Sequence, residues 1–282
     1  MRHVTIEGLP LIARGGQAEI YDYGNGKVLR VAGRRQDFDR IRYEFNVYGC
    51  LDSSEVSVPH AYELVLVNEA PAIIMDKVAG NPMISLIARK PLMVGAWARE
   101  LARLHLELCK VEAGKDITTA KAKAKYCISQ SQILTDGTKQ QLMGVLNGLP
   151  EGTSLCHGDF HPGNIICNNG KSYIIDWVGA SRGDFLADVA HTYVLLRVVP
   201  KVPHISRIRH FIQTCIGRAM ANRYLSEISR HSSFDFGVFS KWVLINAAER
   251  TYYGLESEKE HLRSFVEQCL GGKKKEKLYK ML

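Results

Sequence analysis

Residues 157–177 read His-Gly-Asp-Phe-His-Pro-Gly-Asn-Ile-Ile-Cys-Asn-Asn-Gly-Lys-Ser-Tyr-Ile-Ile-Asp-Trp, and this stretch decides the fold of the chain. Two apolar, β-branched runs, 165–167 and 173–175, stand on either side of Asn168-Asn169-Gly170. Asn and Gly readily adopt the left-handed backbone that tight hairpin turns need. The pattern therefore predicts two antiparallel strands joined by a short turn.

Three side chains near the ends of this hairpin are suited to bind a metal ion and to handle a proton. In the antiparallel pairing Asn164 lies opposite Ile175 or Asp176, so an amide oxygen and a carboxylate come side by side. Hard oxygen ligands of this kind suit Mg2+ that is held together with substrate phosphates. Asp159 precedes the hairpin on a loop that Pro162-Gly163 keeps from being helical, and it is left to orient or deprotonate a hydroxyl group.

The pattern His-Gly-Asp-x-x-x-x-Asn, followed by Ile-Asp-Trp, resembles the catalytic segment of the aminoglycoside phosphotransferase and choline kinase-like family, which has the protein kinase-like fold. The resemblance implies that Asp159 is the catalytic base. It also implies that Asn164 and Asp176 bind the Mg2+ that bridges the phosphates of ATP, with GTP as an alternative donor. His157 would support the catalytic loop from within. Asp188 would hold that loop by accepting backbone N–H bonds, and the alternative for Asp188 is an exposed helical acid.

Composition is that of an ordinary soluble protein. The chain has 282 residues, 46% hydrophobic and 23% charged, with no apolar run that predicts a signal peptide or a transmembrane segment. Seven scattered cysteines without a Cys-x-x-Cys pair are expected to be reduced thiols in a cytoplasmic protein. The tail 271–282 holds five lysines and one glutamate, half of the net charge of +8, so we expect neither a nucleic-acid nor a membrane partner. Nothing in the sequence predicts an oligomeric state.

The amino-terminal part of the chain is rich in predicted strands. Alternating apolar residues and turn signals predict strands at 9–14, 17–23, 27–32, 62–67 and 72–75. Residues 38–48 carry an apolar stripe at helical spacing, and the run 79–82 predicts a linker. We therefore expect an α+β, two-lobed protein kinase-like fold. A nucleotide-binding lobe with a small antiparallel sheet and one helix covers residues 1–78, and a larger, mainly helical catalytic and substrate-binding lobe covers residues 79–282.

Helical spacing dominates beyond the linker. Residues 94–108 keep apolar side chains at i, i+3 and i+4, and His105 on this stripe is expected to be a satisfied core histidine. The lysine-rich segment 110–125 is predicted to be a solvated connection. Further helices are predicted at 184–197, 205–228, 236–253 and 258–270.

Gly15 and Gly16 resemble the phosphate-covering loop of the family. Glycines let the backbone approach closely, so amide N–H groups can point at the β- and γ-phosphates. A predicted strand and not a helix follows them, which argues against a Rossmann site, and no Gly-Lys-Ser/Thr follows them, which excludes a Walker A loop. A plain hairpin turn is the alternative.

Arg30 is the expected cation for the α- and β-phosphates. Strand alternation turns it to the face opposite Lys27, where a cation can point into a cleft. By resemblance Glu44, on the apolar face of its predicted helix, is the ion-pair partner of Arg30. The alternative is a surface glutamate paired with Arg40 or Lys27.

Residues 75–78, Met-Asp-Lys-Val, follow the last predicted strand of the first lobe. By resemblance they form the hinge, and backbone groups of Asp76 and Val78 would meet the adenine edge. No side chain in this run is diagnostic.

A metallohydrolase is one competing interpretation. If 157–161 formed a strand, His157, Asp159 and His161 would share one face at metal-ligand spacing. Pro162-Gly163 and the downstream oxygen ligands fit a magnesium–nucleotide site better.

A nucleotide-binding regulator on the same fold, without phosphate transfer, is the second competitor. Arg30 in place of the usual lysine favours it, whereas the complete set Asp159, Asn164 and Asp176 opposes it. We expect an ATP- and Mg2+-dependent phosphotransferase that acts on a hydroxyl group of a small polar molecule: aminoglycoside-like, an amino alcohol or a sugar. In the family, acidic side chains of the carboxy-terminal helices often contact polyamine acceptors. The candidates here, which we do not assign to the site, are Glu249, Glu256, Glu258, Trp242, Tyr252 and Tyr253.

Overall fold

The computed structural model describes residues 1–15, 18–33, 38–201 and 205–272. Gly16 and residues 273–282 of the lysine-rich tail lie outside the described residues. The chain divides into two compact units, Met1–Ile84 with Gly163–Ala180, and Ser85–Pro162 with Ser181–Leu282. The hairpin that follows the catalytic loop therefore belongs to the same unit as the amino-terminal sheet.

The first unit contains a five-stranded antiparallel sheet with the order β1-β2-β3-β5-β4. Its strands are β1 (Leu11–Arg14), β2 (Ala18–Gly24), β3 (Lys27–Ala32), β4 (Ala61–Val67) and β5 (Ala70–Asp76). Asn25 and Gly26, which join β2 to β3, both have positive φ (50° and 72°), as a tight hairpin turn requires. The five predicted strands are confirmed, with ends that differ by up to two residues.

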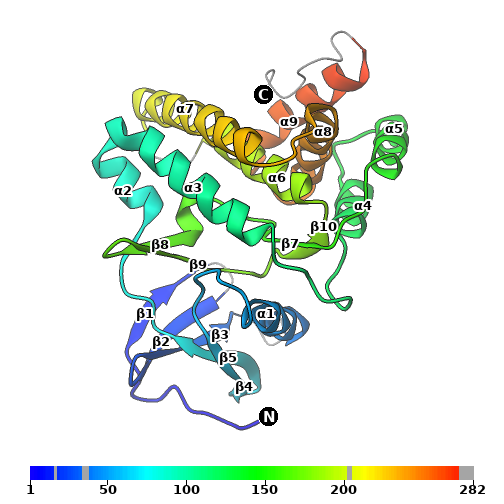
Figure 1. Cartoon of the computed structure of the whole chain (residues 1–282). Helices are drawn as coiled ribbons and strands as arrows, with labels where there is room; N and C mark the ends of the chain where they lie inside the picture. The colour runs from blue at the N-terminus through cyan, green and yellow to red at the C-terminus, as the bar shows by residue number, and fades with distance from the viewer. Residues whose placement is uncertain (16–17, 34–37, 202–204, 273–282) are drawn as a thin grey trace. The chain divides into compact units, whose positions relative to one another are not determined.

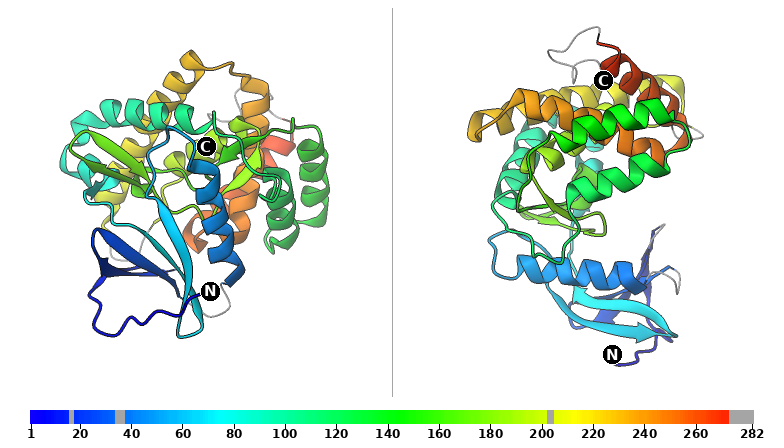
Figure 2. Two further views of the ribbon diagram at one scale, coloured as in Figure 1. Left: turned by 60° about the horizontal axis from the view of Figure 1, so that its bottom comes forward. Right: turned by 90° about the vertical axis from the view of Figure 1, so that its right-hand side faces the viewer.

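Helix α1 (Phe38–Leu51) packs against β4 and β5 (Figure 2). It buries Ile41, Val47 and Tyr48 at helical spacing, together with Glu44. Side chains on alternate positions of the strands form a second apolar cluster, covered in part by the segment before β1: Leu29, Val31, Val65, Val67, Ala72 and Ile74. The central strands β3 and β5 are thus buried on both faces, and Arg30 lies on a position that alternates with Leu29 and Val31.

A second, three-stranded sheet in the same unit has the order β6-β8-β9, from Asn81–Pro82, Ile165–Asn168 and Lys171–Ile174. The predicted linker at 79–82 therefore contains a short strand, followed by α2 (Met83–Arg89). Gly80 has φ 142°, and a Cβ atom there would lie 2.5 Å from the Cys167 carbonyl oxygen, so only glycine fits.

The second unit is mainly helical (Figure 1). It contains the 3-10 turn η2 (Pro91–Met93), α3 (Val94–Leu108), α4 (Ala120–Gln130), α5 (Asp136–Asn147), α6 (Phe185–Arg197), α7 (Arg207–His231), α8 (Phe236–Tyr253) and α9 (Glu256–Leu270). Two short strands, β7 (Ser154–Cys156) and β10 (Ser181–Gly183), pair antiparallel. Helix α8 packs against α4, α6 and α9, which explains why most of its residues are buried.

The segment 110–125 corrects one prediction. Its last residues are the start of α4, whose N-cap Thr119 accepts a hydrogen bond from Ala122 N–H. Ala120, Ala124 and Ile128 are buried at intervals of four, and the lysines between them occupy the other faces. The helix was not predicted because its buried face consists largely of alanine, which contributes little to an apolar pattern in a lysine-rich segment.

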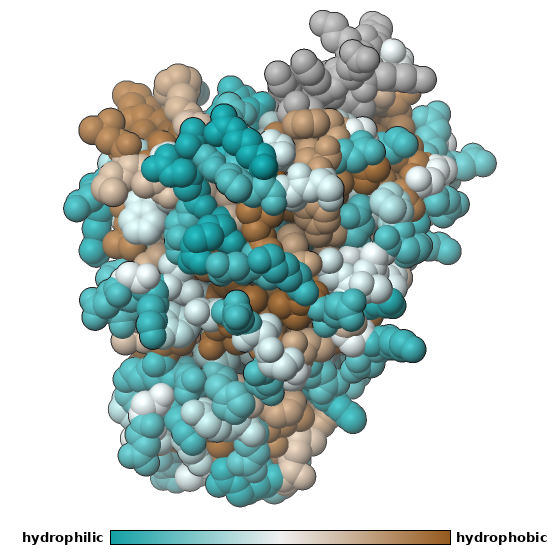
Figure 3. Space-filling model, viewed as in Figure 1, coloured by the Kyte–Doolittle hydropathy of each residue, from teal (hydrophilic) through white to brown (hydrophobic). Residues whose placement is uncertain are grey.

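No helix of the described residues is long and apolar enough to cross a membrane. The face drawn in Figure 3 is covered largely by hydrophilic side chains, with smaller hydrophobic areas between them. All seven cysteines are free thiols.

Candidate active site

The hairpin of β8 and β9 has one of the two predicted registers. Ile175 N–H donates to the Asn164 carbonyl oxygen (3.0 Å), so Asn164 lies opposite Ile175 and next to Asp176. Asn169 and Gly170 in the turn have φ 46° and 80°, the left-handed pair of a two-residue hairpin turn. Local sequence therefore brings the two candidate Mg2+ ligands together, and their amide and carboxylate oxygens suit that ion.

Asp176 ends the hairpin in an unusual backbone conformation. Its φ is 66°, which costs a residue with a Cβ atom roughly 1–3 kcal/mol and is found most often at functional sites. The Asp176 side chain is 41% exposed, and its Oδ1 lies 3.2 Å from the Arg30 guanidinium. Trp177, the next residue, is fully buried.

Arg30 and Glu44 form the predicted ion pair. Arg30 Nε lies 3.1 and 3.0 Å from the two oxygens of Glu44, which is completely buried. Burial by itself would lower the pKa of the Arg30 guanidinium, but the carboxylates of Glu44 and Asp176 raise it above its ordinary value. The alternative of a surface glutamate paired with Arg40 or Lys27 is wrong. The guanidinium is held between a buried carboxylate and a half-exposed one.

Three further residues of the predicted nucleotide site lie in this unit. Gly15 N–H donates to the Ala18 carbonyl (2.9 Å), and a Cβ atom at Gly15 would meet nothing closer than 3.6 Å, so the fold itself does not require glycine there. The Asp76 carboxylate accepts hydrogen bonds from His60 N–H (3.0 Å) and the Tyr62 hydroxyl (2.8 Å). Val78 N–H has no hydrogen-bond partner among the described residues.

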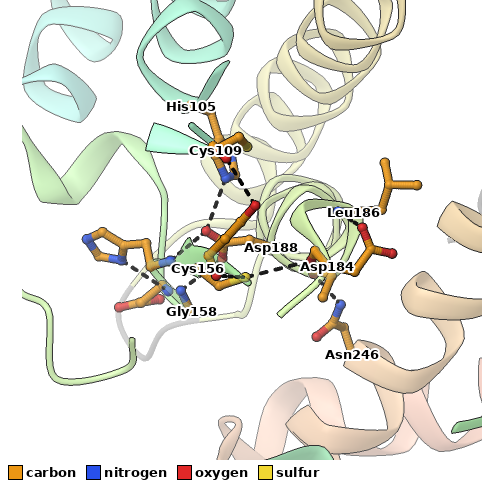
Figure 4. Close-up of polar contacts among 12 residues, drawn as sticks. His105, Cys109, Cys156, Gly158, Asp184, Leu186, Asp188 and Asn246 are labelled. Atoms are coloured by element: carbon orange, nitrogen blue, oxygen red, sulfur yellow. Dashed lines mark hydrogen bonds and ion pairs between the residues drawn. The ribbon is translucent and has the colours of Figure 1, made fainter. Parts of the chain in front are cut away.

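Asp188 holds the catalytic loop in the second unit (Figure 4). It is 3% exposed and accepts hydrogen bonds from His157 N–H (2.6 Å) and Gly158 N–H (2.8 Å), one on each carboxylate oxygen. The alternative of an exposed helical acid is therefore wrong. Asp184, the predicted start of α6, caps that helix by accepting from Leu186 N–H (3.1 Å), and so places Asp188 in the first turn.

A buried histidine and a tyrosine support Asp188 in turn. His105 Nε2 lies 3.1 Å from an Asp188 oxygen, and the Tyr224 hydroxyl lies 2.6 Å from His105 Nδ1. His105 is thus the satisfied core histidine that was expected. Burial would raise the pKa of Asp188, but the hydrogen bond and charge of His105, the charge of His157 and the loop N–H groups lower it well below its ordinary value.

Asp159, the predicted catalytic base, lies on the same loop. Its side chain is 45% exposed, and His161 Nε2 lies 3.6 Å from its carboxylate. Burial would raise its pKa, but the imidazoles of His161, His191 and His157 lower it to about 2, so the carboxylate is ionised at neutral pH. His157 is fully buried, and its Nδ1 accepts a hydrogen bond from Asp159 N–H (3.2 Å). This contact agrees with the expectation that His157 supports the loop from within.

The loop geometry argues against the metallohydrolase interpretation. His157 is turned into the core, whereas Asp159 and His161 face outward. Within the described parts of the chain, no three His, Cys, Asp or Glu side chains are grouped so that they could hold a metal ion.

Comparison with known proteins decides the family. A family model described as "Phosphotransferase enzyme family" matches residues 19–204, about two thirds of the chain. The chain belongs to this family. The prediction of an enzyme of the phosphotransferase class is thereby confirmed. A comparison with curated proteins gives no significant match.

Solved structures share the fold of this phosphotransferase. Aminoglycoside phosphotransferase APH(4)-Ia, in ternary complex with AMP-PNP and hygromycin B, matches with a TM-score of 0.63 and 15% identity, over 97% of this chain and 93% of that one. Amicoumacin kinase hAmiN, in complex with AMP-PNP and Ca2+, matches with a TM-score of 0.64 and 13% identity, over 100% and 94%. A choline/ethanolamine kinase family protein from Mesorhizobium loti matches with a TM-score of 0.60 and 13% identity, over 96% and 90%. These likenesses confirm the protein kinase-like fold.

Some residues near Asp159 in this phosphotransferase were missed by sequence reasoning. His191 is 4% exposed, and its Nε2 contacts the Tyr253 hydroxyl (3.2 Å). Lys123 Nζ lies 3.7 Å from Glu249, although Lys123 was assigned to a solvated connection. A histidine three residues after Asp188 on the same helix was a signal for His191, whereas nothing local in the sequence pairs Lys123 with Glu249.

Proposed function

We propose that this phosphotransferase moves the γ-phosphoryl group of ATP, with Mg2+, to a hydroxyl group of a small polar molecule. The observation that carries the proposal is Asp159: an ionised, half-exposed carboxylate on a loop whose backbone is fixed by buried Asp188. A carboxylate presented in this way can accept a hydrogen bond from an acceptor hydroxyl and orient its oxygen toward the phosphorus atom.

The lowered pKa defines what Asp159 does. A general base is most effective when its pKa is near the working pH, and a value of about 2 is far below it. Phosphoryl transfer through a loose transition state needs little deprotonation of the attacking hydroxyl. In this proposal Asp159 therefore mainly orients the hydroxyl and takes its proton late in the reaction.

The residues of the first unit would serve the nucleotide. Asn164 and Asp176 present the oxygens for Mg2+, which neutralises phosphate charge when bound, and Arg30 supplies a cation for the α- and β-phosphates. Gly15 with Gly16 would cover the phosphates, and backbone groups of Asp76 and Val78 would meet adenine. Residues 1–78 are proposed to bind the nucleotide, and residues 79–282 to carry catalysis and acceptor binding. APH(4)-Ia and hAmiN, which share the fold, were solved with AMP-PNP, and this supports a nucleotide as the phosphate donor.

The test replaces Asp159 with an isosteric amide. Asp159→Asn should lower turnover by roughly 10²–10⁴-fold, because a neutral amide orients the acceptor hydroxyl less strongly than a carboxylate and cannot take its proton. Turnover is measured as nucleoside diphosphate release across a panel of hydroxyl compounds, with ATP and with GTP. Nucleotide affinity, read as the thermal shift that ATP and Mg2+ produce together, should not change.

Three outcomes would count against parts of the proposal. Undiminished turnover in Asp159→Asn would contradict the role of that carboxylate. A thermal shift without turnover on any acceptor would favour the nucleotide-binding regulator. The absence of any shift with ATP and Mg2+, in a folded sample, would contradict the nucleotide site itself.

A further inference from the structure

A cavity of about 210 Å³ lies in the second unit, where the end of α6 meets α7 and the first turn of α9 (Figure 1). This volume has room for several waters, and so for a phosphate-sized group. The described residues that line it include none of those assigned to the nucleotide, to Mg2+ or to the acceptor hydroxyl. Its charged and ionisable side chains come from three stretches of the chain: Arg197, Lys201, His210, Arg218, Glu258 and His261.

Close helix packing brings two arginines to this cavity. At Gly217, α7 crosses the end of α6 so closely that a Cβ atom would lie 2.4 Å from the Leu196 carbonyl oxygen, so only glycine fits. The residue that follows in each helix, Arg218 in α7 and Arg197 in α6, lines the cavity. Arg197 also lies over the Tyr193 ring, with 5.7 Å between the guanidinium carbon and the ring centre. Two guanidinium groups from different helices are thus gathered at one place.

A hydrogen bond holds the segment of the third cation against α7. His210 Nε2 lies 3.0 Å from the Val199 carbonyl oxygen, and since a carbonyl can only accept, the imidazole is the donor. This bond ties α7 to the segment after α6, which carries Lys201. Lys201 and Arg218 are both exposed, so a ligand can reach their charges from solvent.

Glu258 is the acidic residue of the described lining, and its charge is already used inside the protein. It is 2% exposed, and one of its carboxylate oxygens contacts Arg250 (2.5 Å) and accepts from Leu255 N–H (3.1 Å). Arg250 is not among the described residues of the lining. Glu258 therefore offsets the charge of Arg250 and adds no net negative charge for the cations around the cavity.

Lys201 and Arg218 form no ion pair with any residue that the structure describes. Glutamates one turn away on the same helix are a common way to compensate the charge of a helical arginine. Three arginines elsewhere on α7 and α9 have such a partner: Arg223, Arg230 and Arg263. Because Lys201 and Arg218 lack one, the cavity keeps a net positive charge.

This charge suits a dianion. A concave site with an excess of one charge focuses the electric field and attracts ions of the opposite sign. A phosphate monoester carries about 1.5–2 negative charges at neutral pH, and a guanidinium group binds two phosphate oxygens at once. A dianion would match two of the three positive charges of Arg197, Lys201 and Arg218, whereas chloride would match one.

We propose that this cavity binds a phosphate group, either as the free ion or as a small phosphate ester. The site is separate from the one proposed for phosphate transfer, since Asp188 and Arg197 are about 14 Å apart along α6. The inference does not depend on the proposed function, because no residue of this cavity takes part in it. The convergence of cations without a matching acid carries the proposal.

The test measures the unfolding midpoint in inorganic phosphate and in chloride, at equal pH and ionic strength. The double variant Lys201→Gln/Arg218→Gln removes two exposed cations of the cavity. The matched control, Arg103→Gln/Arg263→Gln, makes the same change in net charge at exposed arginines that pair with glutamates of their own helices. General stabilisation by phosphate, and any phosphate bound at the nucleotide site, are the same in both variants.

Phosphate at a hundredfold excess over its dissociation constant should raise the midpoint of wild type and of the control by about 2–4 °C more than that of Lys201→Gln/Arg218→Gln. An equal response of the two double variants would overturn the inference. Glucose 6-phosphate is measured in the same way. The probe with the larger difference between the variants, free phosphate or ester, identifies the form that the cavity prefers.

A second measurement uses the same samples in chloride alone. If Lys201 and Arg218 have no acid to match, their removal should lower the midpoint by no more than about 1 °C, as is usual for surface substitutions. A fall of more than about 2 °C relative to wild type would show that the two cations stabilise the fold itself, and would contradict the assignment.

The two proposals fail in different ways. Failure of the proposed function appears as the absence of a shift with AMP-PNP and Mg2+ in wild type. Failure of the present inference appears as equal responses of the two double variants to phosphate and to glucose 6-phosphate.

Discussion

Each of the two units contains a buried arginine–glutamate pair. The two pairs differ in what the arginine and the glutamate contact besides each other. In Arg30–Glu44 the arginine side chain is 10% exposed and the glutamate fully buried; in Arg250–Glu258 the values are 11% and 1%. Arg30 extends beyond its glutamate to Asp176, a half-exposed carboxylate at 3.2 Å. Arg250 reaches no second carboxylate within ion-pair distance among the described residues, and Glu258 instead caps the first turn of α9.

The difference shows that burial and pairing alone do not indicate function. A buried ion pair gains little net stability, since the desolvation of both charges offsets their attraction. The first pair is distinguished by Asp176, the second carboxylate that Arg30 contacts, which is half-exposed and is a candidate Mg2+ ligand. The first pair is therefore expected to matter most for activity and the second for stability, and four measurements test this difference.

The largest effect is expected from Glu258→Ala. This substitution leaves Arg250 buried without its carboxylate and Leu255 N–H without its acceptor, so the free energy of unfolding should fall by about 3–5 kcal/mol. Turnover per folded molecule should be unchanged. Urea unfolding and an activity measurement at low temperature check both statements, and a loss of turnover in folded protein would remove the contrast.

Glu44→Gln should act on catalysis. Without the Glu44 charge, Arg30 is free to turn fully toward Asp176. In the proposed site it would then compete with Mg2+ for that carboxylate, and its guanidinium would leave the position proposed for phosphate binding. We expect roughly a 10²-fold loss of kcat/KM for the nucleotide, since a displacement of about 1 Å can cost that much. The stability loss should be smaller than in Glu258→Ala because Asp176 still compensates Arg30. Unchanged kinetics in Glu44→Gln would contradict the positioning role.

His191 extends the comparison to a buried group that forms no ion pair with the residues the structure describes. Its folded-state pKa is about 3, against about 6.5 in the unfolded chain, so between these values only the unfolded state binds the proton. The contribution of neutral His191 to the free energy of unfolding is complete above pH 6.5. It falls by about 1.4 kcal/mol for each pH unit below that value, so about 2 kcal/mol is lost at pH 5. His191→Gln should flatten the stability profile between pH 6.5 and 5. His231→Gln, at an exposed histidine, is the control and should leave the profile unchanged.

The smallest effect is expected for an arginine–glutamate ion pair on the surface. Arg263 of α9 contacts Glu260 at 2.8 Å and Glu267 at 3.0 Å, with side chains that are 35–73% exposed. Exposed pairs exchange protein contacts for hydration and are screened by salt. Glu260→Gln should move the unfolding midpoint by no more than about 1 °C, and a shift comparable to that of Glu258→Ala would show that burial is not what separates the pairs.

Several features of the site could be predicted because they depend on residues close in the chain. The β8–β9 turn follows from Asn169 and Gly170, and the proximity of Asn164 to Asp176 follows from the pairing of two adjacent strands. The cap of α6 by Asp184, and hence the place of Asp188 in its first turn, also follows from local sequence. The Arg30–Glu44 pair spans 14 positions and was found by resemblance to a family, not by spacing.

The strands, most helices and the hairpin with its candidate Mg2+ ligands follow from local sequence, since turn chemistry, strand alternation and helical periodicity act over a few residues. Which charged and polar side chains pair in the core of the second unit depends instead on how its helices pack. Lys123 meets Glu249 and Tyr224 meets His105 across more than a hundred positions. Such pairs leave no local pattern, because a buried side chain is stabilised by whichever partner the packing of helices brings within hydrogen-bonding or ion-pair distance.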